Sequence, residues 1–167
     1  MESIIETSPQ YQKIESGADY EAATDLVIAR ASRNIRIFDN QVSSAFNSSK
    51  RCELLRSFLL ANRINRLRIV LHDTRYLITG CPRMLSLLRQ FSHCIAIHET
   101  LEDAKQVYDP FTVADESHYV HRFHYTTSRG LLALNDLNGA HEFINRFEQI
   151  WEASHPALSA TKLGLRG

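Results

Sequence analysis

The sequence contains few of the residues that hold small secreted or metal-bound domains together. Its 167 residues include only three cysteines, Cys52, Cys81 and Cys94, and these are isolated from one another and lack C-x-x-C spacing. An odd number of isolated cysteines argues against a disulfide framework and indicates a reducing compartment. We therefore expect buried thiols and a cytoplasmic location.

Long apolar runs are also absent. No stretch approaches the roughly 20 residues that a transmembrane helix needs, so no membrane partner is expected. The N-terminus, MESIIETSPQYQKIES, lacks the cationic start and apolar core of a secretory signal. With 44% hydrophobic and 23% charged residues, the composition is that of a globular protein. The length predicts one domain over residues 1–167, with an irregular lead-in at 1–15 and a tail at 156–167.

Net charge is zero, but the charges are unevenly distributed along the chain. Residues 30–89 hold twelve cationic side chains against only Asp39, Glu53 and Asp73. The rest of the sequence is correspondingly acidic. Such a segregation is typical of a protein that binds a polyanion on one face, or of one that matches charged surfaces in a dimer. Solvated helix faces are the alternative interpretation.

Motifs for common chemistries are missing. The sequence has no Ser/His/Asp nucleophile elbow, glycine-rich phosphate loop or zinc-ligand spacing. Three histidines recur at residues 118, 121 and 124, but alternation along a strand divides them between two faces. His118, Arg122 and His124 share one face with Val120, and the other face holds His121, Tyr119, Phe123 and Tyr125. We therefore expect no metal and no cofactor, and retain His118 and Arg122 as candidate ligand-binding residues.

Helical and extended patterns alternate through residues 19–99. Apolar residues at helical spacing predict helices over 19–33 and 50–64, and Pro82 suits the first turn of another. Apolar runs predict strands over residues 34–39, 67–73 and 94–99. The run LRIVLHD is almost continuously apolar, which is typical of a parallel strand covered on both faces. This alternation predicts a βαβ sheet.

The pattern changes after residue 101. Three close strands are predicted at 111–115, 118–125 and 129–136, and their spacing favours antiparallel additions to the same sheet. A strongly amphipathic helix over 139–154 follows. The predicted fold class is therefore α/β, with a mixed sheet flanked by helices.

Polar side chains follow two of the predicted parallel strands. Asp39 ends one strand, and His72 and Asp73 end the next. Open α/β sheets bind ligands at this edge, so an acid–base pair is one hypothesis for these residues. Arg83, at the start of the following helix, is a candidate anion-binding residue. The alternative is that these residues cap strands at the surface.

The C-terminal part of the chain resembles one known family. The order YDPFTVADESHYVHRFHY, RGLLALND and a helix ending FINRFEQIWEASHP is similar to the second part of a phospholipase D-like domain. In that family a His-x-Lys-(x4)-Asp motif enters a strand, a hairpin follows, and a closing helix carries Phe, Trp and Ser. Laid on this chain, the motif's Asp falls at Asp115, its His at Tyr108 and its Lys at Pro110. The element order extends the resemblance from about Asp19 to Pro156.

The resemblance implies a fold and argues against the family's chemistry. The motif His attacks phosphorus, a second His protonates the leaving oxygen, and Lys holds the phosphate charge. Tyr108 and Pro110 replace the nucleophile and the charge clamp, and no other copy of the motif exists. Family enzymes bring two motif copies together, and this chain has the length of one half. The resemblance therefore implies a homodimer, to which we expect the strand face of Tyr119, Phe123 and Tyr125 to contribute.

Three functional hypotheses follow. The first is a non-catalytic phospholipase D-like binding or regulatory module, for which nucleic acid is the most natural polyanion. The second is an accessory domain that contacts a partner protein, and the third is an enzyme rebuilt around Asp39, His72 and Asp73. Aromatic side chains enclosed by the chain's own helices are the alternative to the dimer.

Overall fold

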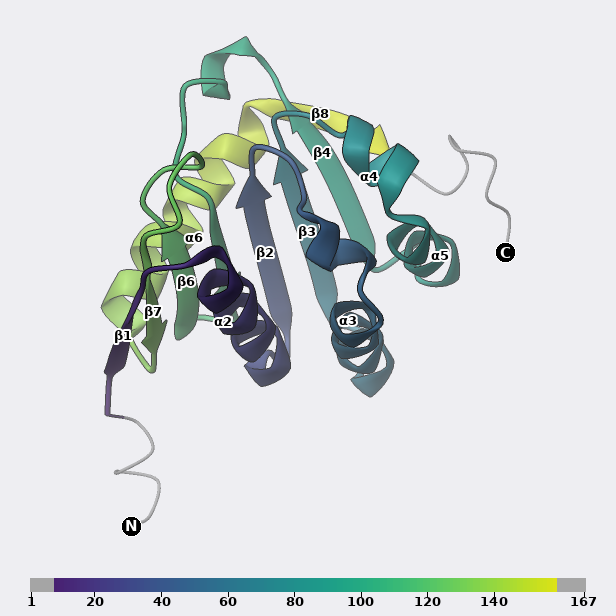
Figure 1. Ribbon diagram of the computed structural model, residues 1–167. Helices are drawn as coiled ribbons and strands as arrows, with labels where there is room; N and C mark the ends of the chain where they lie inside the picture. Colours follow the sequence, from purple (N-terminus) through teal and green to yellow (C-terminus); the bar gives the residue numbers. More distant parts are fainter. Residues whose placement is uncertain (1–7, 159–167) are drawn as a thin grey trace.

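An eight-stranded mixed sheet forms the middle layer of the computed structural model, which describes residues 8–158 (Figure 1). Its strand order is β1-β7-β6-β5-β2-β3-β4-β8. β2, β3 and β4 are parallel, and every other pair of neighbours is antiparallel. The strands are β1 (Gln10–Ile14), β2 (Asn34–Asp39), β3 (Arg66–Leu71), β4 (Ile95–Thr100), β5 (Phe111–Ala114), β6 (His118–Arg122), β7 (Gly130–Leu134) and β8 (Ser154–Leu158).

Helices cover both faces of this sheet. α6 (Leu137–Glu152) crosses one face, and Figure 1 shows the other helices in front of the opposite face. These are α2 (Gly17–Arg30), α3 (Ser49–Ala61), α4 (Arg75–Gly80) and α5 (Pro82–Gln90), with short 3-10 turns η1 (Ser44–Asn47) and η2 (Glu102–Ala104) in the connections. The predicted α/β class with a mixed, helix-flanked sheet is confirmed. In the part of the chain that the structure describes, no helix is long and apolar enough to cross a membrane.

Local sequence signals account for where the helices begin. The Ser16 hydroxyl accepts a hydrogen bond from the Asp19 N–H at 3.1 Å, and Ser48 caps α3 in the same way. Pro82 occupies the first turn of α5, as its fixed φ favours. The apolar run of β3 is buried on both faces, since Leu67, Ile69, Val70 and Leu71 are all fully enclosed.

Both ends of the described chain differ from the prediction. Residues 10–14, assigned to an irregular lead-in, form β1 and pair with β7, and residues 154–158, assigned to a helix end and tail, form β8 and pair with β4. Each is an outer strand of the sheet, held by backbone hydrogen bonds rather than by an apolar face. The sequence prediction also missed α4. The remaining lead-in and tail, residues 1–7 and 159–167, lie outside the described residues.

The predicted aromatic strand face is wrong. Alternation holds from His118 to Arg122, where β6 ends, so Phe123 and Tyr125 lie in the following loop. Tyr119 is buried beneath α6, with its ring centroid 4.7 Å from that of Phe143. Tyr119 therefore belongs to the core of its own chain, and it is unavailable to a partner.

The closing helix, α6, covers one of the buried apolar clusters of the sheet. Phe147 of α6 is completely buried against Phe38 and Val70 of the sheet, whereas Phe143 and Trp151 are partly buried at the margin of this cluster. Trp151 stacks on His98, with 3.6 Å between ring centroids. The position of α6 fixes which sheet residues face it, and therefore which cations it can pair.

Candidate functional site

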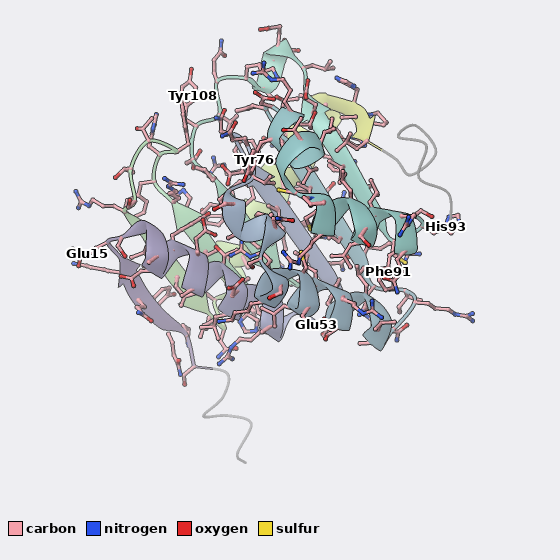
Figure 2. The ribbon with its side chains drawn as sticks, turned by 45° about the vertical axis from the view of Figure 1, so that its right-hand side comes forward. Glu15, Glu53, Tyr76, Phe91, His93 and Tyr108 are labelled. Atoms are coloured by element: carbon pink, nitrogen blue, oxygen red, sulfur yellow. The ribbon has the colours of Figure 1, made fainter. Side chains whose placement is uncertain are left out.

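The positions of the phospholipase D-like motif provide no phosphate-attacking group. Pro110 is buried, and Tyr108 is 45% exposed with its ring 5.5 Å from that of His124. Figure 2 shows Tyr108 projecting from the upper part of the molecule, well away from Glu53 on α3. A phenol at this position has an exposed ring, which suits contact with a ligand better than nucleophilic attack.

Asp115 is a structural residue in this fold. Its backbone adopts the left-handed conformation, with φ of 55°. Its carboxylate accepts hydrogen bonds from the backbone N–H groups of Ser32, Arg33 and Asn34 at 3.0, 2.7 and 2.9 Å. These bonds hold the connection from α2 into β2 and leave the carboxylate little capacity for a ligand.

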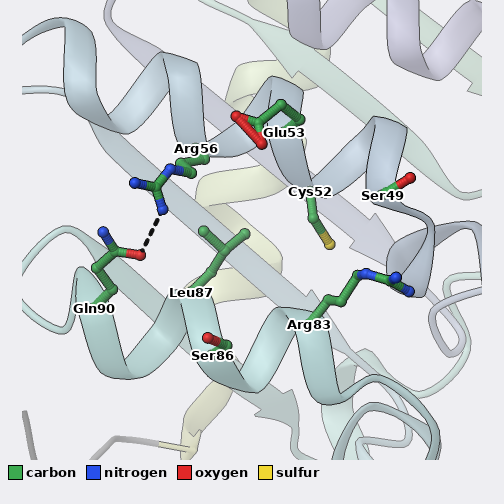
Figure 3. Close-up of a pocket in the computed structure, with 8 residues that line it drawn as sticks. All are labelled: Ser49, Cys52, Glu53, Arg56, Arg83, Ser86, Leu87 and Gln90. Atoms are coloured by element: carbon green, nitrogen blue, oxygen red, sulfur yellow. Dashed lines mark hydrogen bonds between the residues drawn. The ribbon is translucent and has the colours of Figure 1, made fainter.

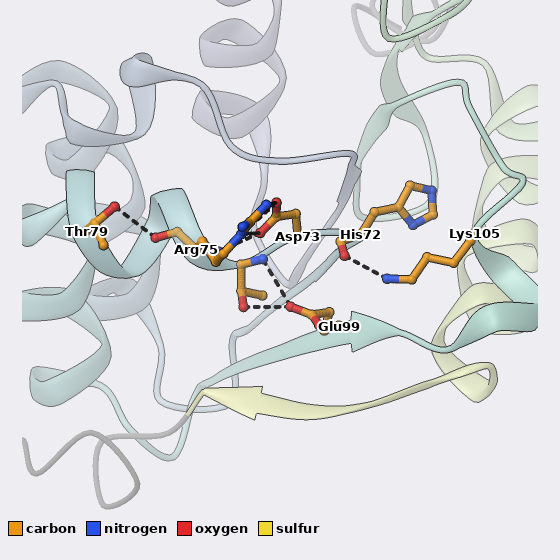
Figure 4. A network of polar contacts seen from close by, with 7 residues as sticks. His72, Asp73, Arg75, Thr79, Glu99 and Lys105 are labelled. Carbon is orange, nitrogen blue, oxygen red and sulfur yellow. Dashed lines mark hydrogen bonds and ion pairs between the residues drawn. The ribbon is translucent and has the colours of Figure 1, made fainter.

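His72 and Asp73 lie at the expected sheet edge, but both are committed to structural contacts (Figure 4). The His72 Nε2 donates to the carbonyl of Val107 at 2.7 Å, so its Nδ1 accepts from the Thr100 hydroxyl at 2.7 Å. Burial lowers the pKa of His72, which keeps the ring neutral. Hydrogen bonds from Arg75 lower the pKa of Asp73 to about 2. Within the described residues, no hydrogen bond joins the side chains of His72, Asp73 and Asp39.

Asp39 and Arg122 are brought together by the fold. They come from β2 and β6, and they line one cavity with Tyr125 at the edge where the parallel strands end. Burial raises the pKa of Asp39 to about 7, although the Asn40 N–H and Arg122 act in the opposite direction. Of the predicted edge residues, Asp39 alone has a carboxylate oxygen that the described residues leave without a hydrogen-bond partner.

His118 is held by a structural contact. The His118 Nδ1 accepts a hydrogen bond from the Asn135 N–H at 3.1 Å, and burial lowers the pKa of His118.

The sequence prediction missed a polar network on the opposite face of β6. On the α6 side, the Asp109 carboxylate lies between His121 Nε2 at 2.9 Å and Arg146 Nη2 at 2.6 Å. Burial acts to raise the pKa of Asp109, but these two partners outweigh it and the pKa is lowered. No sequence signal joins these three residues, because they come from a loop, a strand and a helix.

Metal ligands do not gather anywhere in residues 8–158: no group of three His, Cys, Asp or Glu side chains is arranged to hold an ion. The three cysteines carry free thiols, two of them buried.

Four of the twelve cations in residues 30–89 are neutralised by carboxylates. Arg51 is completely buried and pairs with Asp25 at 2.7 Å and Glu21 at 3.0 Å. Arg36 and Arg68 lie on the α6 side of the sheet, and both pair with Glu148 of α6. Arg68 donates two hydrogen bonds to this carboxylate. Arg75 pairs with Asp73 at 2.7 Å. These pairs are structural, and they remove part of the predicted basic surface.

The other eight cations form what we call the cationic face. Among the residues that the structure describes, none of them forms an ion pair with a carboxylate. One group lies on the outer helices and the other at the adjoining sheet edge, where the parallel strands begin (lower edge in Figure 1). Their members are Lys50, Arg56, Arg83 and Arg89 on α3 and α5, and Arg30, Arg33, Arg63 and Arg66 at the edge.

A groove between α3 and α5 lies within this face (Figure 3). Its volume is about 190 Å³, and Arg56 and Arg83 line it from opposite helices. Arg56 donates to the Gln90 side chain at 3.1 Å and Arg83 to the Asn47 carbonyl at 2.8 Å, so both remain uncompensated charges. Neither helix has an acidic residue in its first turn, which adds the positive end of each helix dipole to the same region. Glu53 is the one carboxylate among the residues lining the groove.

Sequence comparison assigns the chain to a family. Residues 16–163 match the model of a family described as Domain of unknown function (DUF7931). The chain belongs to this family. Among curated proteins, none has a significantly similar sequence.

Solved structures establish the fold. Nuc from Salmonella typhimurium, described as a phospholipase D family member, superposes with a TM-score of 0.63 at 15% identity, over 91% of this chain and 100% of its own. NucT from Helicobacter pylori gives 0.61 at 11% identity, over 90% and 100%. TrmBL2, described as an archaeal chromatin protein with a novel mode of DNA binding, gives 0.66 at 12% identity, over 94% of this chain and 58% of its own. The DUF7931 chain therefore has a phospholipase D-like fold.

Proposed function

We propose that this chain is a non-catalytic phospholipase D-like module that binds nucleic acid through its cationic face. The observation that carries the proposal is the separation of paired from unpaired cations. Eight basic side chains without carboxylate partners lie on the outer helices and at the adjoining sheet edge of a chain whose net charge is zero. Neutralising phosphates with arginine and lysine releases condensed counterions, and this supplies most of the affinity of sequence-independent binding.

The geometry of the groove favours a phosphate backbone over an isolated anion. Arg56 and Arg83 lie on opposite walls, and Lys50 stands near the beginning of α3. Further arginines continue the positive charge along the sheet edge, beyond the ends of α2 and α3. An extended polyanion meets several of these positions at once, whereas a single phosphate meets one or two. The DNA-binding description of TrmBL2, which shares the fold, supports nucleic acid as the first polyanion to test.

The absence of catalysis is proposed from the motif positions. Tyr108 and Pro110 supply neither a nucleophilic imidazole nor an ammonium group to hold the phosphate, and Asp115 is engaged by three backbone N–H groups. His72, the histidine of the predicted rebuilt site, has both ring nitrogens in hydrogen bonds. We expect no hydrolysis of a chromogenic phosphodiester above a purification blank. Turnover that disappears in His121→Ala would contradict the proposal.

Binding is tested with a fluorescently labelled single strand of about 15 nucleotides, whose length matches a common site size. We expect the anisotropy to report binding at low salt, and the affinity to fall about tenfold or more in Arg56→Gln/Arg83→Gln. The matched control is Lys13→Gln/Arg129→Gln. It removes two exposed cations that line a cavity beside β1 and β7, at the other end of the strand order from β3 and β4. Equal losses in both double variants would mean that overall charge, and not this face, determines binding.

Self-association remains a prediction. With Tyr119 buried, the exposed rings near the predicted strand face are those of Tyr108, Phe123 and Tyr125. Light scattering at micromolar concentration is expected to give twice the monomer mass. A clean monomer mass would exclude the homodimer and leave these rings free for another ligand.

A further inference from the structure

A polar cavity lies at the end of β2, on the opposite edge of the sheet from the arginines of the strand starts. Its volume is about 320 Å³, which is the lower end of the range for small-molecule sites. The side chains that line it are almost all polar: Asp39, Asn40, Gln41, Ser43, Arg122 and Tyr125. Open α/β sheets place ligands at this edge.

Asp39 and Arg122 both line the cavity, and each has side-chain polar atoms without a described hydrogen-bond partner. Asp39 receives one hydrogen bond, from the Asn40 N–H to Oδ1 at 2.7 Å, and its Oδ2 has no partner in the described residues. The Arg122 Nε donates to the carbonyl of Thr127, and its guanidinium carbon lies 5.5 Å from the centre of the Tyr20 ring. No described carboxylate lies within ion-pair distance of Arg122, so the terminal amino groups of this side chain keep their donors.

The Tyr125 ring lines this cavity, and two other aromatic rings lie next to it. Tyr125 stacks on His124, with centroids 4.9 Å apart and 21° between the planes, and Tyr108 lies 6.2 Å from Tyr125. Tyr125 is 38% exposed and Tyr108 45% exposed, so both retain accessible ring surface. Flat apolar surfaces next to hydrogen-bonding groups are what single-stranded nucleic acid sites use to stack bases and read their edges.

We propose that this cavity binds an unpaired guanine base. Guanine carries two adjacent donors on its Watson–Crick edge, N1–H and the N2 amino group, which match the carboxylate of Asp39. Its O6 and N7 acceptors match the guanidinium of Arg122, and its ring stacks on Tyr125. Adenine, cytosine and thymine lack the adjacent pair of donors and leave the carboxylate incompletely bonded. The assignment rests on the proposed nucleic-acid function, because it reads one base of a bound strand.

The chain between the cavity and the cationic face is short. Ser43 lines the cavity and caps η1, whose last residue, Asn47, accepts a hydrogen bond from Arg83 at 2.8 Å. Ser48 then caps α3, and Lys50 follows in its first turn. A nucleic-acid strand whose phosphates contact Lys50 and Arg83 can therefore pass over η1 and place a base in the cavity.

Recognition by Asp39 makes the preference for guanine depend on pH. The donors of guanine bind the ionised carboxylate, and its pKa of about 7 in the free protein means that half the molecules carry a proton near neutrality. The charged and titratable groups around it are Arg122 of β6, Arg51 of α3, and Tyr20 and Glu21 of α2. Binding of guanine releases the proton, so the preference rises with pH through about 7 and levels off above it.

The test compares thymidine strands of about 15 nucleotides whose central base is guanine, hypoxanthine or adenine. We expect guanine to bind about tenfold more tightly than adenine, as a bidentate contact provides. Hypoxanthine, which lacks the N2 amino group, should be intermediate. Asp39→Asn and Tyr125→Ala should each remove the preference, and circular dichroism checks that they fold. The matched control Asp73→Asn changes the carboxylate that ends the neighbouring strand and should keep the preference.

Each outcome decides one of the two claims. Binding of all three strands with equal affinity would overturn the guanine site and leave the cationic face as a sequence-independent binder. A preference that survives both Asp39→Asn and Tyr125→Ala would place base recognition elsewhere. No binding of any strand at low salt would overturn the proposed function itself.

Discussion

The two faces of the sheet differ in how many of their arginines are paired with carboxylates. On the α6 side, Arg36 and Arg68 are enclosed by the closing helix and share the carboxylate of Glu148. On the opposite side, Arg51 and Arg75 also pair with carboxylates, but Arg56, Arg83 and Arg89 of α3 and α5 form no ion pair with any described carboxylate. All of these cations come from the same basic stretch of sequence, residues 30–89. A basic segment is therefore divided by the fold into cations that pair with carboxylates and cations that do not.

The difference shows why local charge counts are weak predictors of binding surfaces. A cation contributes to binding only when its own chain leaves it unpaired, and pairing is decided by contacts distant in sequence. Arg68 and Glu148 lie 80 residues apart, and nothing local to either one predicts the pair. Changes on the α6 side should therefore alter stability, and changes on the cationic face should alter binding.

The largest expected effect is on the α6 side. Phe147→Ala removes a completely buried ring from the cluster under α6 and should lower the free energy of unfolding by about 3–5 kcal/mol. Chemical denaturation measures this change. The matched control is Phe123→Ala, whose ring is 51% exposed and whose loss should cost about 0.5 kcal/mol or less. Similar losses for both would mean that α6 is peripheral and that the comparison of faces fails.

A smaller loss is expected from the ion pairs beneath α6. Glu148→Gln leaves Arg36 and Arg68 without their carboxylate and should cost about 1 kcal/mol, a modest figure because the Glu148 side chain is 43% exposed. Binding to single strands should be unchanged. Hydrogen bonds from Arg68 lower the pKa of Glu148, so its contribution is present above the unfolded pKa and is lost as pH falls through the folded pKa. A variant as stable as the wild type at pH 7 would contradict the structural role.

A third effect concerns pH and Asp39. Burial raises the pKa of this carboxyl above its unfolded value, so ionisation favours the unfolded state. The resulting loss of folding stability begins as pH rises above the unfolded pKa and is complete above about pH 7. Asp39→Asn should therefore raise the unfolding midpoint at pH 8 and change it little near pH 4. The same midpoint shift at both values would show that Asp39 does not titrate as described.

The sequence predicts the interior of this fold better than its edges. β3 and α6 were readable because burial imposes an apolar pattern on LRIVLHD and on the Phe143–Trp151 segment. β1 and β8 were missed because an outer strand with exposed side chains needs no such pattern, and its pairing is decided by distant backbone.

The candidate site was predictable only in part. The position of Asp39 at a strand end was correct, since parallel strands end at one edge. Its partner Arg122 was identified as a candidate separately, but alternation along a strand does not say which cavity a side chain lines. The hydrogen bonds that join the His72 ring to Thr100 and Val107 were unpredictable, because those residues lie far from His72 in the sequence.

The salt dependence of single-strand binding tests the central claim most directly. The logarithm of the association constant is measured against the logarithm of salt concentration for the wild type and for Arg56→Gln/Arg83→Gln. Each phosphate contact contributes a slope of about −0.7 on a single strand, so the double variant should lose about 1.4 from the magnitude of the slope. Glu148→Gln should keep the wild-type slope. A wild-type slope near zero, or an unchanged slope in the double variant, would contradict a phosphate-binding role for the cationic face.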